Sequence, residues 1–382
     1  MAGRTASVVL LLVPAVGLAA LDLAIVASAG SRPGPPGLGA PNHYAVRQAV
    51  GIVLGGALGW VVVRVGVERV LRAAPALFLA ALIATAAVFV PGIGVRAAGA
   101  SRWLRLGPFS GNPAPFLIGA TGLLVAAWGS SGASAGGGAL SRFASRPLAL
   151  GLALLAVLVL VAEPDFSVAV VALCVTFAAL AGTGVAGRRL VPAAVVVLIA
   201  LALGASRFGY VGDRIHGYLS PESDRRGHGF EVLALARAKA SGAAGPAGLG
   251  HGTARRHLSS PASDYVFAVV NEELGRRGAW AVVGAWVAIA AGAALSTRSA
   301  RGDARLRGVA AACAAALLTP AALHIAVCRG WMPITGVTMP FLSYDPALAV
   351  ASGAEIGVLV AIALARAPRP EAAAASADGP IA

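Results

Sequence analysis

Long apolar runs are the feature of this chain that most constrains its fold. Of the 382 residues, 58% are hydrophobic and 12% are charged, and the apolar residues form long stretches instead of the alternating pattern of a water-soluble core. A helix needs about 20 such residues to cross roughly 30 Å of hydrocarbon. Ten segments approach that length: 6–29, 47–67, 70–91, 113–131, 147–162, 166–185, 189–205, 277–296, 307–328 and 347–366. The sequence therefore predicts an all-α polytopic membrane protein with about ten transmembrane helices.

The placement of arginine predicts how these helices are oriented. Cytoplasmic loops carry an excess of Arg and Lys, and the larger share of the arginines beside short loops falls on the side of the N-terminus. Both termini are therefore expected in the cytoplasm. We expect residues 1–366 to form a single integral membrane domain, and residues 367–382, which are rich in Ala and Pro, to form a disordered cytoplasmic tail.

Residues 206–263 form one long polar insertion before the eighth predicted span. The orientation above makes it extracytoplasmic, and loops of this length in compact proteins are usually functional or disordered. The insertion contains four of the six histidines, but their spacing matches no standard zinc arrangement, so no protein-bound metal is expected. The formal charge of +14 fits membrane topology and attraction to anionic headgroups, and no nucleic-acid motif accompanies it.

Asp264 is the strongest candidate for a functional residue. It lies at the start of an apolar segment, directly after the polar insertion, where an ionisable group is costly to keep dry and easy to present to a substrate. The alternative is structural, because Ser263 and Asp264 are both good helix N-caps. Two other polar residues, Asp22 and His324, lie within predicted spans, where they mark a cavity or bond a neighbouring helix.

Six short motifs follow one another along the chain. They are RQ at 47–48, GASRWLRLGPF at 99–109, EPDFSVA at 163–169, ASGAAGPAGLGHG at 240–252, SDYVFAVVNEELG at 263–275 and MPITGVTMPFLSY at 332–344. In this order and at these intervals they resemble the motifs of the SEDS family (shape, elongation, division and sporulation), the FtsW/RodA/SpoVE type of cell-wall glycosyltransferase. The resemblance covers nearly the whole chain and implies a SEDS-like bundle of helices.

The resemblance also implies an activity and a site. In the family's reaction a sugar 4-hydroxyl displaces undecaprenyl pyrophosphate from lipid II, which extends a peptidoglycan strand. The resemblance places the general base for that hydroxyl on Asp264, a role that contributes roughly 10²–10⁴ in rate. The pyrophosphate needs cations to meet its developing charge. The candidates for binding it or the sugar are Arg102, Arg214, Lys239 and Arg256.

Cofactors, partners and location follow from the same resemblance. No tightly bound cofactor is expected, and a Mg²⁺ or Mn²⁺ ion would be held largely by the pyrophosphate of the substrate. The expected partners are lipid II, membrane lipids and a class B penicillin-binding protein, which is a transpeptidase. The expected location is the bacterial cytoplasmic membrane, in cell division, elongation or sporulation.

Several positions depart from the family pattern. An intramembrane carboxylate and its cationic partner are replaced by apolar residues within 112–118, a Tyr-Gln pair by Phe230 and Glu231, an asparagine by His324, and a Gly-Gly pair by Asp345 and Pro346. These departures leave open a second reading, a catalytically weak paralogue that acts as a scaffold for the cell-wall machinery. A lipid-intermediate transporter is a third reading, but the predicted spans carry few charges.

The two glutamates that follow Asp264 invite a mechanism with two carboxylates. Glu272 lies eight residues further on, which is ~12 Å along a helix, and that is too far for two carboxylates to act on one bond. We therefore expect Glu272 and Glu273 to be structural or to position a loop, and to pair with arginines such as Arg276 or Arg277; the alternative is that one of them faces the substrate channel. The glycine-rich tract 242–252 is expected to form a flexible re-entrant turn.

Overall fold

The computed structural model of the chain describes most of its length. The described residues are 2–29, 43–97, 100–106, 109–129, 146–163, 165–207, 209–224 and 227–365. The predicted tail at 367–382 lies outside them.

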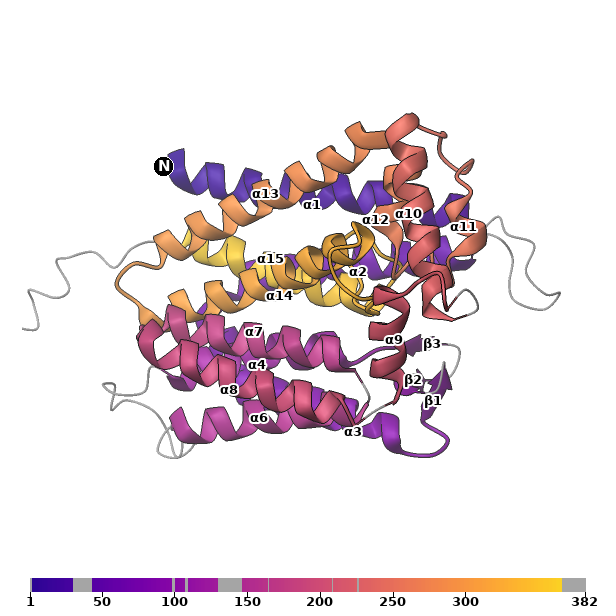
Figure 1. Ribbon diagram of the computed structural model, residues 1–382. Helices are drawn as coiled ribbons and strands as arrows, with labels where there is room; N and C mark the ends of the chain where they lie inside the picture. The colour runs from indigo at the N-terminus through magenta and orange to yellow at the C-terminus, as the bar shows by residue number, and fades with distance from the viewer. Residues whose placement is uncertain are drawn as a thin grey trace, which may run out of the picture.

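One apolar helix coincides with most of each of the ten predicted membrane segments. These helices are α1 (Ala2–Ala29), α2 (His43–Val65), α3 (Val67–Ala86), α4 (Ala114–Gly129), α6 (Arg146–Ala162), α7 (Phe166–Gly182), α8 (Gly187–Ala205), α13 (Gly275–Ser299), α14 (Ala304–Cys328) and α15 (Pro346–Leu364). They form one bundle (Figure 1). Within the described residues, seven are long and apolar enough to cross a membrane, and α4, α6 and α7 are shorter apolar helices. The helical membrane fold predicted from the sequence is therefore confirmed.

The polar connections gather at one end of this bundle (Figure 1). The predicted insertion contains α9 (Gly209–Leu219), α10 (His228–Ala244) and α11 (Ala254–His257), and the short helix α12 (Val266–Glu273) follows it. The same end holds the 3₁₀ helix η1 (Ala87–Phe89) and a small antiparallel sheet in the order β1 (Gly94–Ala97), β2 (Ala100–Leu106), β3 (Phe109–Gly111). The sequence did not predict this sheet, which adds a small β element to a helical protein.

An aspartate side chain caps the N-terminal end of three of the long helices. Asp165 accepts a hydrogen bond from the backbone of Val168 at the start of α7, and Asp303 caps α14 in the same way. Asp345 caps α15, which has Pro346 in its first turn. An aspartate at the N-cap satisfies backbone donors that the helix leaves unpaired, and proline suits the first turn because it lacks a donor there. The departure from the family pattern at 345–346 thus forms a helix start.

The departure at 112–118 also has a local explanation. The Oδ1 atom of Asn112 accepts a hydrogen bond from the backbone N of Ala114, at 3.0 Å, where α4 begins. The following residues Leu117 and Ile118 are buried in the core. Residues 112–118 therefore start α4 and pack it into the core with apolar side chains, and no buried ion pair is formed by Pro115 and Ile118.

Glycines let α2 and α15 pack backbone against backbone. A Cβ added at Gly55 would clash with the carbonyl oxygen of Ala349, and one at Gly353 would clash with the backbone of Gly55. Gly51 and Gly59, one turn to either side in α2, also face the backbone of α15. Small residues four apart allow close approach between membrane helices, where packing has to replace the hydrophobic effect that lipid does not provide.

Adding one methyl group to either of two adjacent glycines tests this packing. Gly55→Ala is expected to lower the thermal unfolding midpoint of the detergent-solubilised protein, because overpacking costs roughly 1–3 kcal/mol. Gly56→Ala is the matched control, since a Cβ at Gly56 meets nothing within 4 Å. Equal midpoints for the two variants would contradict the close approach of α2 and α15.

Candidate functional site

Asp264 lies in the loop end of the bundle, just before α12. Its backbone N donates to the carbonyl of Ser260 at 3.0 Å, which forms a turn that presents the carboxyl group. The N-cap of α12 is Tyr265, and no side chain of the described residues caps that helix end. The structural alternative for Asp264, a helix cap, is therefore wrong.

The loop between α14 and α15 holds this turn in place. Tyr344 donates its backbone N to the carbonyl of Ala262 at 2.9 Å. Ser343 donates its hydroxyl to the carbonyl of Ser263 at 2.7 Å and accepts from the backbone N of Met339 at 2.8 Å. The two motifs around 264 and 332–344 therefore meet in space, and the second fixes the backbone that carries the carboxyl group.

His324 connects three elements beneath this turn. It is fully buried on α14, and its Nε2 accepts from the backbone N of Phe267 at 3.4 Å. That assignment makes Nδ1 the protonated nitrogen, which donates to the carbonyl of Val337 at 2.8 Å. The residue that departs from the family's asparagine thus satisfies a backbone donor at the start of α12, which otherwise has no partner inside the helix.

A second buried contact joins α1 and α2 to the same loop. The side-chain amide of Gln48 donates to Asp22 Oδ2 at 2.5 Å and to the carbonyl of Ser343 at 3.1 Å. Gln48 belongs to the RQ motif, and Asp22 is the polar residue noted within the first predicted span. Asp22 therefore bonds a neighbouring helix, as one of the two readings from the sequence expected.

Arg102 and Asp165 form an ion pair near Asp264. Arg102 Nη1 lies 3.3 Å from Asp165 Oδ2, and its Nε donates to the carbonyl of Glu163 at 3.3 Å. The side chains are 25% and 10% exposed, so water screens this pair only in part. Strand β2 supplies the arginine and the start of α7 supplies the aspartate, which brings the second and third motifs together.

Burial shifts the acidities in this region upward. Burial raises the pKa of Asp264 to about 6, and the negative charges of Glu231 and Asp165 raise it further, while a hydrogen bond from Ser263 and the charge of Arg102 lower it. Burial raises the pKa of Glu163 to about 8, with Asp165 adding to the rise and Arg102 opposing it. Asp264 is thus largely ionised at neutral pH but a stronger base than an ordinary aspartate.

The four predicted cations fall into three places. Arg102 and Arg214 both lower the pKa of Asp165, which burial raises, so they lie around that carboxylate. Lys239 lies on α10 and donates its Nζ to the carbonyl of Arg329 at 3.4 Å. Arg256 lines a separate open cleft. The structure therefore does not gather all four around one ligand position.

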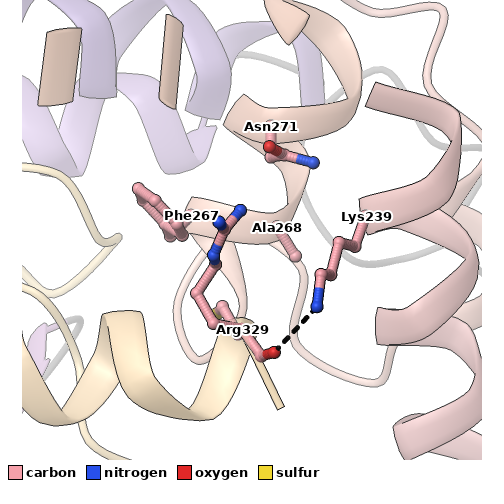
Figure 2. A pocket seen from close by; sticks show the side chains of 6 residues that line it. Lys239, Phe267, Ala268, Asn271 and Arg329 are labelled. Carbon is pink, nitrogen blue, oxygen red and sulfur yellow. Dashed lines mark hydrogen bonds between the residues drawn. The ribbon is translucent and has the colours of Figure 1, made fainter. Parts of the chain in front are cut away.

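Lys239 and Arg329 face a small crevice at the end of α14. Figure 2 shows both side chains beside Asn271 and Phe267 of α12. The described residues that line the crevice include no carboxylate, so its two cations have no counter-charge there. Trp331, whose side chain is 69% exposed, follows Arg329 in the chain, and tryptophan favours the membrane interface.

Glu231 joins the cleft around Arg256 to the turn that carries Asp264. The hydroxyl of Tyr265 donates to Glu231 Oε2 at 2.7 Å. Burial raises the pKa of Tyr265, and the charge of Glu231 raises it further, so the phenol stays protonated as the donor. Sequence reasoning missed both residues and Arg329, although the departures at 230–231 and the position of Tyr265 beside Asp264 were available as signals.

Glu272 and Glu273 hold the glycine-rich tract by a dense set of hydrogen bonds. Glu272 Oε1 accepts from the backbone N and hydroxyl of Thr253 at 3.0 and 2.8 Å, and its Oε2 accepts from the backbone N of Ala254 at 2.8 Å. Glu273 accepts from the backbone N of Gly250 at 3.1 Å and from two nitrogens of Arg255, one of them at 2.7 Å.

These contacts confirm one expectation and correct two. The glutamates do position a loop, as predicted. Their arginine partner is Arg255, whereas Arg276 and Arg277 are exposed, because the chain folds α11 back over α12 and turns the first turn of α13 outward. The glycine-rich tract 242–252 is also not a flexible turn. Its backbone N–H groups at 247 and 248 donate to the backbone oxygens of Glu272 and Glu273, and that of Gly250 donates to the Glu273 carboxylate.

The comparisons with known proteins agree with this arrangement. The chain matches the family model FTSW_RODA_SPOVE, described as cell cycle protein, over residues 8–367. It belongs to the FtsW/RodA/SpoVE family. The family predicted from six motifs is thereby confirmed. The matched residues include nine of the ten long helices completely and all of α1 except its first six residues, 2–7.

Two relatives show how far the likeness extends. A protein of Coxiella burnetii (strain RSA 493 / Nine Mile phase I), named probable peptidoglycan glycosyltransferase FtsW, is 30% identical over 351 residues, or 90% of this chain and 93% of that protein. A protein of the same name from Alcanivorax borkumensis is 29% identical over 357 residues, or 92% and 91% of the two chains. Both are therefore similar to this chain over nearly their whole length.

Two solved structures share the fold. A chain of a structure titled as the structural coordination of polymerization and crosslinking by a peptidoglycan synthase complex has a TM-score of 0.70 and 24% identity, over 91% of this chain and 96% of that chain. The rod shape determining protein RodA of Thermus thermophilus has a TM-score of 0.64 and 23% identity, over 92% and 94%. This FtsW/RodA/SpoVE member is accordingly a multi-pass membrane protein with the family fold.

Removing the charge of Glu273 tests how much its contacts with Arg255 and the glycine-rich tract contribute to stability. Glu273→Gln is expected to lower the thermal unfolding midpoint and to expose residues 245–257 to trypsin, because breaking a buried ion pair costs roughly 3–5 kcal/mol. The Arg255 and Glu273 side chains are 8% and 0% exposed. Glu68→Gln is the control, because its contact with Arg305 is exposed and exposed pairs contribute about 0–1 kcal/mol. Equal unfolding midpoints and equal resistance to trypsin in both variants would contradict a stabilising role of the pair formed by Glu273 and Arg255.

Proposed function

We propose that this protein is a peptidoglycan glycosyltransferase that extends glycan strands from lipid II. The observation that carries the proposal is the carboxyl group of Asp264, held by two backbone contacts at the loop end of a membrane bundle and given a pKa of about 6 by burial. Relatives named probable peptidoglycan glycosyltransferase FtsW, similar over nearly the whole chain, support it.

Asp264 acts as the general base in this reaction. It takes the proton from a sugar 4-hydroxyl while that oxygen forms a bond to the anomeric carbon of lipid II, and the bond from that carbon to the pyrophosphate breaks. The undecaprenyl pyrophosphate leaves with the electron pair, and Asp264 then releases its proton to water. A base with a raised pKa takes up the proton more readily while remaining ionised at the working pH.

Lys239 and Arg329 offer positive charge to the leaving pyrophosphate at the end of α14, although the narrow crevice between them has no room to enclose that group. Two cations without a carboxylate among the described lining residues suit a dianionic group, and the exposed Trp331, two residues after Arg329, supports a position at headgroup depth. Arg102 and Arg214 supply positive charge around Asp165, and the charge of Arg102 also acts on Asp264.

The topology and the partner complete the proposal. Both termini lie in the cytoplasm and the end that holds Asp264 faces outward, since the arginines beside short loops favour this orientation. The partner is a class B penicillin-binding protein, because a strand that is polymerised has to be crosslinked and a structural relative comes from a peptidoglycan synthase complex.

Polymerisation of labelled lipid II by the purified protein, with and without its transpeptidase, tests the proposal. Wild-type protein is expected to form glycan strands, and Asp264→Ala is expected to reduce the rate at least about 10²-fold because the proton acceptor is lost. Unchanged elution of the variant on size exclusion would show that it is folded. Wild-type protein that is inert with its partner would contradict the enzyme and favour a scaffold.

The pH dependence of the rate tests the electrostatics around Asp264. Activity is expected to fall as the pH drops through about 6, because the base must be ionised. Glu231→Gln is expected to move this acidic limb to lower pH, since the charge of Glu231 raises the pKa of Asp264. Arg102→Gln is expected to move it to higher pH, since Arg102 lowers that pKa. Shifts in the same direction for both variants would exclude Asp264 as the titrating group.

A further inference from the structure

Helix α9 presents an uncovered apolar stripe at the loop end of the bundle. Val211, Ile215 and Leu219 follow one another at intervals of four residues, which places their side chains on one side of the helix. Ile215 is 45% exposed and Leu219 is 72% exposed, so the rest of the described chain leaves most of these two side chains uncovered. Such a stripe is costly to leave in water.

The opposite side of α9 packs on the protein. Gly217 is buried, and a Cβ added to it would lie 2.8 Å from the backbone N of Gly229 at the start of α10. Because Gly217 follows Ile215 by two residues, it lies ~200° around the helix from it. The hydroxyl of Tyr218 donates to the carbonyl of Gly330 at 3.2 Å, which attaches α9 to a second element. The helix is therefore held on one side, and its apolar stripe faces away from the protein.

The position of α9 matches the surface of a membrane. The helix begins at Gly209, four residues after α8 ends at Ala205. No residue of the apolar window Gly187–Gly204 in α8 is buried by the described part of the chain, as expected of a span surrounded by lipid. Figure 1 shows α9 running across the direction of the long helices. A helix that starts where a lipid-exposed span ends, and then crosses it, lies along the membrane plane.

The residues around the stripe have the chemistry of a membrane interface. Trp331 is 69% exposed and follows Gly330, to which Tyr218 is bonded, and tryptophan favours the depth of the headgroups. Arg207 lies between α8 and α9 with an exposed side chain, where a guanidinium can bind a lipid phosphate. Helices of this kind bury their apolar face about 5–10 Å into the boundary between headgroups and acyl chains.

We propose that α9 is a membrane-surface helix whose stripe inserts, together with Trp331, into the outer leaflet of the bilayer. Lipid is the occupant, and not a partner protein or a second copy of the chain, because the stripe continues the lipid-exposed surface of α8. The outward orientation is taken from the proposed topology, but the inference needs no glycosyl transfer. The anchor holds the start of the polar insertion, and the loop of Gly330 bonded to it, at the membrane surface.

The depth of labels attached to α9 tests the inference. Ile215→Cys and Leu219→Cys are each made in the full-length chain, labelled with a nitroxide and placed in nanodiscs of phosphatidylethanolamine and phosphatidylglycerol. Both labels are expected about 5–10 Å below the headgroups, where dissolved oxygen relaxes them and a water-soluble nickel chelate does not. The unsubstituted protein, treated with the same reagent, corrects for labelling of Cys174, Cys313 and Cys328.

Asp213→Cys is the matched control for these labels. Asp213 is exposed on the same helix and lies ~200° around it from Ile215. Its label is therefore expected in water, where the nickel chelate relaxes it. Labels at Ile215 and Leu219 that are as accessible to the chelate as the control would overturn the inference, and so would labels that protein shields from both reagents.

The fluorescence of Trp331 provides a second test that leaves α9 unchanged. The emission lost in Trp331→Phe isolates this residue from the other tryptophans. It is expected to be quenched more strongly by lipids brominated near the headgroup than by lipids brominated near the chain ends, because tryptophan favours the interface. Emission that neither lipid quenches would contradict the insertion of Trp331. Both tests are made without turnover, so their outcome is separate from the polymerisation of lipid II.

Discussion

Two loops that are far apart in the sequence are joined by hydrogen bonds that hold the backbone before Asp264, the residue that we propose as the base. The hydroxyl of Ser343 and the backbone N of Tyr344 bond the carbonyls of Ser263 and Ala262, immediately before Asp264. These bonds lie partly inside the protein, where a hydrogen bond is stronger and an unpaired polar group is more costly than in water. They fix the carboxyl group where burial raises its pKa, so the proposed chemistry depends on them.

Contacts between helices of the bundle hold the loop of Ser343 in place. Gln48 bonds the carbonyl of Ser343, and its helix can approach because Gly55 and Gly353 leave no side chain between α2 and α15. Phe341 adopts a left-handed backbone with φ of 60°, which is unusual for a residue with a side chain and shapes the turn before Ser343. Residues in such conformations are held by their surroundings and gather at functional sites. Helix packing and loop geometry thus converge on one short segment.

The sequence predicted those features that depend on local pattern. Apolar runs located the long helices, and the order of six motifs predicted the family. The motif spacing GxxxGxxxG at 51, 55 and 59 was present in the sequence and could have predicted the contact between α2 and α15. The helix caps at Asp165 and Asp345 could likewise have been inferred from aspartates that precede apolar runs.

Contacts between distant segments could not be predicted in the same way. The pairing of Glu273 with Arg255 instead of Arg276 depends on how α11 folds over α12, which no local pattern encodes. The bond between Tyr265 and Glu231 and the cleft beside it depend likewise on the docking of α10. The small sheet was missed because its strands are short and lie in a loop rich in glycine and arginine.

The most direct test of this account is the titration of the Asp264 carboxyl group itself. Infrared difference spectroscopy of wild-type protein against Asp264→Asn, over a range of pH in lipid, isolates the C=O stretch of the protonated acid. A midpoint near pH 6 is expected, because burial raises the pKa of this group. A midpoint at the ordinary value of about 4 would show that the carboxyl group is solvated, and would contradict the central claim that the docked loops hold it in a partly dry site.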